Sequence, residues 1–239
     1  FRDRRLARAL VAARKRGVAG NVIGEHSPRR AHANQAVAKI LTGEQGLARG
    51  YRIIKHFALP TPVGSLRVAH LHEKLYCFSH PTPCAFIGSF NPSGDLPEDD
   101  PALIREIGDQ DRGHNALVEL RHPALMAPLL DHVRAVDSSG HSILERCSAS
   151  ANRVVVADDI SVFFSPRVAQ NPAVRLLNAL VAGDDLRVAS SHLKGRGARL
   201  FQRLARRGVQ VTILAEDTHR RVPERVLSDL ADAGASIRR

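Results

Sequence analysis

His72 and Lys74, two residues apart, are the positions of this chain with the clearest chemical potential. Ser89 and Asn91, in the run Gly-Ser-Phe-Asn, repeat the two-residue spacing a short distance downstream. A histidine can act as nucleophile or base, a lysine is a fixed cation, and serine and asparagine are neutral hydrogen-bond donors. This set fits a phosphodiester, which needs attack at phosphorus and neutralisation of its non-bridging oxygens.

A hairpin is the element that must position these four side chains. We predict strands over 66–78 and 84–87, and the two prolines within 79–83 favour a turn between them. Side chains alternate between the faces of a strand, so residues two apart point the same way. The hairpin is therefore expected to place all four side chains side by side.

The pattern His-x-Lys followed by Gly-Ser-x-Asn resembles the signature of the phospholipase D superfamily. The resemblance extends to a strand that follows Asn115 and a helix that follows Pro123. It also includes two similar halves, each opening with a helix, an Arg-Gly-Val type of turn and a strand, here around Gly17 and Gly208. The most specific part of the resemblance covers residues 70–120.

The resemblance implies a mechanism and a set of roles. His72 is the catalytic nucleophile that forms a covalent phosphohistidine. Lys74, as a second catalytic residue, holds the phosphoryl oxygens together with the phosphate-binding residues Ser89 and Asn91. A second histidine from the other half protonates the leaving group, and neither a metal nor another cofactor is implied.

Two local departures from the family pattern bear on the site. Ser79 stands where the family usually has an aspartate, five residues after Lys74. His114 stands where some members have a carboxylate that orients the nucleophile, so we take His114 and Asn115 as candidate supporting residues. Glu119 is an alternative source of that carboxylate.

The second catalytic motif is expected beyond Arg239. The triplet His192-Leu193-Lys194 cannot replace it, because it precedes the second Arg-Gly-Val turn and no Gly-Ser-x-Asn follows. We therefore expect an interior fragment of a two-motif protein. The second catalytic half is expected from the missing C-terminal part or from a homodimer.

The expected fold class is α/β: a phospholipase D-like mixed sheet flanked by helices, in two pseudo-repeated halves that are both incomplete. The first half, with both motifs, is expected over 1–136, a linker over 137–152 and the start of the second half over 153–239. Helices are predicted over 4–16, 31–41, 123–136, 172–182, 197–206 and 223–233. Further strands are predicted over 18–23, 51–58, 116–120, 153–157, 160–164, 186–190 and 209–214, and a long acidic loop over 92–113.

Composition limits the class of partner. The 239 residues carry a net charge of +11 and are 44% hydrophobic, which favours a globular protein over a disordered one. The charge fits an anionic partner: a phosphate ester, a nucleic acid or an anionic membrane surface.

Cys77 and Cys84 are expected to be small core residues, and His132 is expected, with most other histidines, on the surface.

Three functions remain open. A phospholipid enzyme, either a phospholipase D or a phosphatidyltransferase, is favoured by two unequal halves on one chain. A nuclease of the same family is favoured by the basic charge, although aromatic residues for base stacking are few. A non-catalytic scaffold of the same fold is suggested by Ser79 and by the missing second motif. The sequence does not indicate a compartment.

Overall fold

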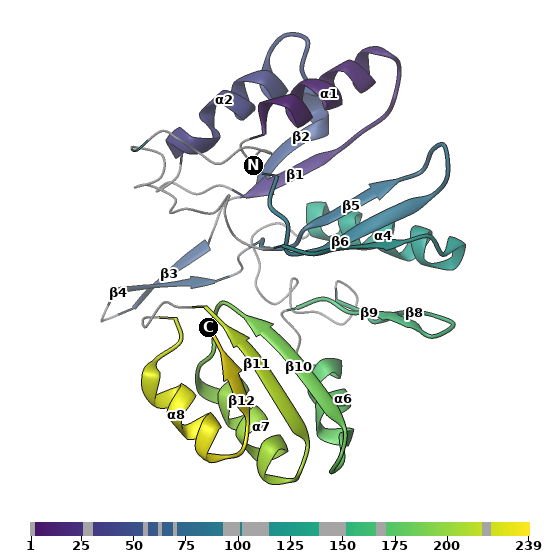
Figure 1. The fold of residues 1–239 in the computed structure, drawn as a ribbon. Coiled ribbons are helices and arrows are strands. Elements are labelled where there is room, and N and C mark those ends of the chain that lie inside the picture. Colours follow the sequence, from purple (N-terminus) through teal and green to yellow (C-terminus); the bar gives the residue numbers. More distant parts are fainter. Residues whose placement is uncertain are drawn as a thin grey trace. The chain divides into compact units, whose positions relative to one another are not determined.

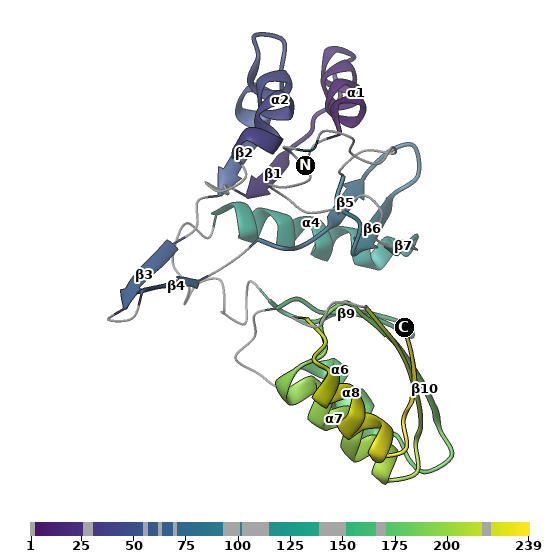
Figure 2. The same cartoon turned by 60° about the vertical axis from the view of Figure 1, so that its left-hand side comes forward.

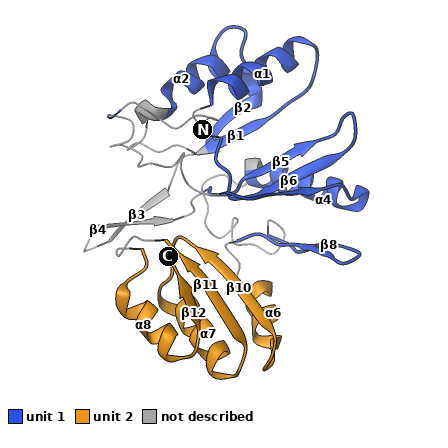
Figure 3. Ribbon diagram, viewed as in Figure 1, with its two compact units in different colours: residues 1–168 blue, residues 169–239 orange. Residues whose placement is uncertain are grey.

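The computed structural model contains mixed α/β architecture with several small sheets (Figure 1). The described residues are 3–25, 31–54, 57–61, 64–68, 71–92, 101, 115–138, 152–165, 171–216 and 221–239. They form two compact units, residues 1–168 and 169–239 (Figure 3). Among these residues, no helix is both long enough and apolar enough to cross a membrane.

Unit 1 opens with two helices and a parallel strand pair. Helices α1 (Arg4–Lys15) and α2 (Ala31–Thr42) pack together, and β1 (Val22–Glu25) pairs parallel with β2 (Tyr51–Ile54). The buried side chains of this subdomain come from both helices and from the turn before β2: Ala7, Val37, Leu41 and Leu47. The predicted strand over 18–23 starts later than expected, and the predicted strand over 51–58 ends early, at Ile54.

Antiparallel strands build the rest of unit 1. β3 (Phe57–Thr61) pairs with β4 (Gly64–Val68), and β8 (Val155–Ala157) pairs with β9 (Ile160–Val162). A three-stranded sheet has the order β5 (Leu75–Phe78), β6 (Cys84–Gly88), β7 (Leu117–Leu120).

Helix α4 (Pro123–Ser138) packs on both β5–β6 and β8, so one core joins these elements. Leu125 and Leu129 of α4, Ala85 of β6 and Val155 of β8 lie in that core. The β8–β9 hairpin, which we expected to open the second half, thus packs with the first half, and the boundary between the compact units falls after 168. The predicted linker over 137–152 and loop over 92–113 lie almost entirely outside the described residues.

Unit 2 is a parallel three-stranded sheet in the order β10 (Asp185–Ser190), β11 (Gln210–Ala215), β12 (Ser236–Arg238). Helices α6 (Pro172–Ala179), α7 (Gly195–Arg206) and α8 (Glu224–Asp232) lie on one face of it (Figure 2). Leu204 and Leu230 from the helices meet Ile213 of β11 in the core, each burial contributing about 1.5–3 kcal/mol. Along β10, exposed residues alternate with half-buried ones, as expected of a sheet covered on one face.

The two Arg-Gly-Val segments share one helix-ending geometry. Gly17 and Gly208 have φ of +87° and +88°, and the N–H of the following valine donates to a carbonyl five residues back in both. Gly234 ends α8 with the same pattern, at φ +95°. A left-handed glycine is a common way to end a helix, so this similarity is not specific to a repeat. The two-half organisation remains a prediction.

Candidate functional site

Three segments with the predicted site residues meet at one end of the β5–β6–β7 sheet. β5 pairs antiparallel with β6, Leu75 opposite Ile87, and β6 pairs antiparallel with β7, Gly88 opposite Leu117. The residues just before β5, just after β6 and just before β7 therefore lie at the same end of the sheet, where these strands begin or end. These are 71–74, 89–92 and 115–116, which contain His72 to Lys74, Ser89 to Asn91, and Asn115.

The prediction that His72 and Lys74 lie on a strand is wrong. Residues 71–74 are irregular, and β5 begins at Leu75. A hydrogen bond next to this segment runs from the Gly88 N–H of β6 to the Lys74 carbonyl, at 3.3 Å. The next N–H, that of Ser89, donates to the Ala116 carbonyl at 2.9 Å, because successive N–H groups of a central antiparallel strand point to opposite neighbours.

Lys74 is held against the backbone of the candidate nucleophile. Its Nζ donates to the His72 carbonyl at 2.8 Å. His72, Ser89 and Asn91 are exposed, and Lys74 is half-buried. An exposed histidine with an ammonium tethered to its own carbonyl suits attack on an anionic ester, because the cation can offset the charge that develops on phosphorus-bound oxygens. That the four side chains surround one phosphate stays a prediction.

Gly88 and Ser89 fix the approach of β7. A Cβ built on Gly88 would lie 1.9 Å from the Ala116 carbonyl oxygen, so only glycine permits this packing. Ser89 bonds Ala116 twice, through its own N–H and through Oγ, which accepts from the Ala116 N–H at 3.1 Å. Ser89 thus ties the Gly-Ser-x-Asn run to the residue that follows Asn115.

Further contacts hold the end of the same run. The Tyr76 hydroxyl donates to the Phe90 carbonyl at 3.1 Å, between Ser89 and Asn91. Burial raises the pKa of Tyr76, so this phenol remains protonated and able to donate at neutral pH. The Asp3 N–H donates to the Pro92 carbonyl at 3.1 Å, which links the start of α1 to the chain just after Asn91.

The structure also shows a partly buried Glu–His pair that sequence reasoning missed. Glu73, between His72 and Lys74, has its Oε2 2.9 Å from Nε2 of His132 on α4. The His132 side chain is only 4% exposed, and its ring stacks on Phe164 with centroids 3.4 Å apart. The expectation of a surface position for His132 is wrong, because Glu73 and Phe164 give this ring both a polar partner and an apolar cover. The one available signal was its place among Leu125, Met126 and Leu129 on the inner face of α4.

The other residues singled out from the sequence differ in exposure and in their partners. Asn115 is exposed just before β7, and His114 lies outside the described residues. His192 and Lys194 are exposed after β10, as expected of a chance triplet. Glu119, the alternative carboxylate, forms a 2.6 Å ion pair with Arg121. Within the described ranges, no three His, Cys, Asp or Glu residues are grouped as a metal site.

The two described cysteines lie on the two paired strands of the β5–β6 hairpin. Cys77 lies opposite Ala85 and Cys84 opposite Phe78, and both thiols are free and half-buried. Burial, and then the nearby Cys84, raise the pKa of Cys77 to about 11. A thiol that stays protonated is a poor nucleophile, which favours a structural role for Cys77.

No protein-family model, curated protein or solved structure matches this chain.

Proposed function

We propose that this chain provides half of a phosphodiester-cleaving site in which His72 is the nucleophile. The observation that supports the proposal is the gathering of the His72, Ser89 and Asn115 segments at one edge of the β5–β6–β7 sheet. These segments come together although up to 43 positions separate them in the chain (115 − 72). The resemblance to the phospholipase D superfamily, which rests on the same segments, adds the roles.

In the proposed reaction, an unprotonated ring nitrogen of His72 attacks phosphorus. The bond from phosphorus to the leaving oxygen breaks, and a phosphohistidine remains. Lys74, Ser89 and Asn91 neutralise and orient the non-bridging oxygens during this step. Water or an alcohol then attacks phosphorus and releases His72. A second histidine, from a second copy of the chain or from further sequence, donates the proton to the leaving group.

Phospholipids are the first substrate class that we propose, on the strength of the resemblance to phosphatidyl-transferring members of the family. Nucleic acid is the second, and one observation favours it. Helix α7 carries several exposed arginines without a carboxylate in its sequence, which suits a phosphate backbone. A non-catalytic scaffold is the outcome if His72 has no chemical role.

A chromogenic ester tests the nucleophile without the second half of the site. p-Nitrophenolate leaves without needing a proton, so bis(p-nitrophenyl) phosphate can react with His72 even where no general acid is present. We expect a burst of at most one p-nitrophenolate per chain, followed by slow turnover, and a phosphoryl adduct on His72 detected by mass spectrometry. Both should disappear in His72→Ala with its thermal melt unchanged.

The same burst distinguishes the substrate classes by competition. A dispersed short-chain phosphatidylglycerol should slow the burst if the pocket accepts lipid, and a single-stranded oligonucleotide should slow it if the pocket accepts nucleic acid. A burst that persists in His72→Ala, or no p-nitrophenolate release from the unaltered chain, refutes the proposal.

A further inference from the structure

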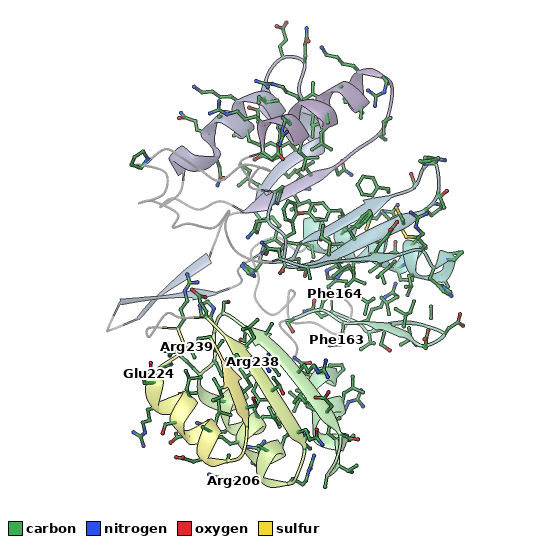
Figure 4. The ribbon with its side chains drawn as sticks, viewed as in Figure 1. Phe163, Phe164, Arg206, Glu224, Arg238 and Arg239 are labelled. Carbon is green, nitrogen blue, oxygen red and sulfur yellow. The ribbon has the colours of Figure 1, made fainter. Side chains whose placement is uncertain are left out.

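A row of arginines runs along the exposed face of α7. The arginine row consists of Arg196, Arg199, Arg203 and Arg206, all exposed. Successive members are three or four residues apart, which places them on one side of a helix. The other side, with Leu200 and Leu204, is buried in the core of unit 2. Arg206 is at the end of α7 that leads into β11 (Figure 4).

Three of the other arginines of unit 2, Arg187, Arg221 and Arg239, are paired with carboxylates. Arg187 lies 2.8 Å from Asp185, and Arg239 lies 2.6 Å from Glu224. Across the described part of the chain, by contrast, no ion pair reaches a member of the arginine row. The sequence from 186 to 215 contains no Asp or Glu, so α7 has no carboxylate of its own to offset its charge.

The arginine row has no role in folding that the structure shows. Like charges three and four residues apart repel one another and destabilise a helix. The buried face already fixes α7 against the sheet. Arg207, the next arginine, differs, because its guanidinium donates to the carbonyls of Asn178 and Leu180 and so ties α7 to the end of α6. An external anion is the partner that would offset the charge of the row.

The shape of the charged surface favours a linear anion over a flat one. Helix α8 packs beside α7 and exposes Asp229 and Asp232, so a broad anionic surface laid over the helices would also approach these acids. The apolar face of α7 is buried in the protein, so α7 cannot insert into a membrane as an amphipathic helix does. A single strand of polyanion lying along α7 would meet the arginine row and no carboxylate of that helix.

The dimensions and the residue type fit a phosphate backbone. At 1.5 Å per residue, Arg196 and Arg206 are about 15 Å apart along the helix axis. That length equals the axial rise of about four base pairs of a duplex, at ~3.4 Å of duplex axis per phosphate of one strand. The planar guanidinium binds two phosphate oxygens at once, which a lysine cannot do. We propose that the arginine row of α7 binds the phosphate backbone of a nucleic acid.

This binding goes beyond the proposed cleavage and does not depend on it. A chain whose His72 proves inert can still bind nucleic acid through α7. If both proposals hold, the binding supports the nucleic-acid candidate over the phospholipid one.

The test compares two double variants with the same change in net charge. Arg199→Gln/Arg203→Gln removes two members of the arginine row, and Arg187→Gln/Arg225→Gln removes two exposed arginines of β10 and α8. Glutamine forms helix nearly as well as arginine at 199, 203 and 225, and Arg187 is an exposed residue of β10, so both variants should fold, which thermal melting checks. Binding of a short fluorescent DNA duplex is followed by fluorescence anisotropy over a range of salt concentrations.

We expect the variant of the row to lose about tenfold or more in affinity near 0.1 M salt, and its salt dependence to weaken by about two phosphate contacts. The control variant should lose much less. Equal losses in the two variants mean that net charge alone drives binding, and overturn the proposal, as does unchanged binding in both. Binding to phosphatidylglycerol vesicles that needs the row, without binding to DNA, also overturns it and assigns the surface to membranes.

Discussion

Glu73 Oε2 lies 2.9 Å from Nε2 of His132, and this contact fixes the residue between His72 and Lys74 to the middle of α4. The His72-Glu73-Lys74 segment is not part of a strand, so it lacks the hydrogen-bond ladder that would hold it. The buried imidazole provides one side-chain anchor in its place, and the Phe164 ring stacks on that imidazole. The geometry of the candidate site therefore depends on a helix and on a hairpin remote in the sequence.

We expect His132→Ala to destabilise unit 1 by about 1–3 kcal/mol, because it leaves a partly buried carboxylate without its partner and removes the ring that stacks on Phe164. Urea unfolding measures the loss. Arg134→Ala, which breaks an exposed pair with Asp131 on the same helix, is the control and should stay within about 0.5 kcal/mol. Equal losses in the free energy of unfolding would show that the Glu73–His132 contact stabilises the fold no more than an exposed ion pair does.

Lys74 and Lys194 offer a matched comparison, since each follows a histidine by two residues. Lys74→Ala should slow the p-nitrophenolate burst about 100-fold, because a fixed cation beside the developing charge contributes ~3 kcal/mol. Lys194→Ala should leave the burst rate nearly unchanged, since Lys194 lies exposed in unit 2 after β10. Stopped-flow absorbance measures both rates, and a Lys194 effect as large as that of Lys74 would contradict the assignment of the site.

Gly88→Ala should destabilise unit 1 by about 1–3 kcal/mol, the usual cost of forcing extra volume into a packed position. The added methyl would meet the Ala116 carbonyl, so β7 has to move away from β6. Gly197→Ala is the control: its site in α7 is open, and alanine there should stabilise by up to about 1 kcal/mol. Denaturant unfolding compares the two. A neutral Gly88→Ala variant would show that β6 and β7 need not approach so closely.

The raised pKa of Cys77 makes stability fall at alkaline pH. The thiol titrates at about 11 in the folded chain against 9.0 when unperturbed, so the folded state holds its proton more tightly. The contribution of Cys77 to stability is complete below about pH 9 and is lost as pH rises toward 11. Thermal melting across this range should show a smaller decline in Cys77→Ala. An identical decline in that variant would mean that Cys77 does not contribute.

Local chemistry determined most of the secondary structure in advance. Helix ends were predictable where a glycine follows the last turn, as at Gly17, Gly208 and Gly234. The β5–β6 hairpin followed from two apolar runs separated by prolines, and the strand–helix alternation after 153 followed from hydrophobic periodicity. These features depend on neighbouring residues, so a single chain reveals them. The same reasoning assigned the Lys194 triplet to the surface.

Tertiary contacts decided the site. The sequence indicated His72, Lys74, Ser89 and Asn91 as a set, but it predicted a strand where the chain is irregular, because a two-residue spacing cannot show where a ladder ends. In the structure β5 begins only at Leu75, and Ser89 is tied to Ala116, a residue of the next segment. His132 was wrongly assigned to the surface, although its place on the inner face of α4 was a signal for burial. Its burial depends on Glu73 and Phe164, 59 positions before it and 32 after it, and no local pattern encodes contacts at that separation.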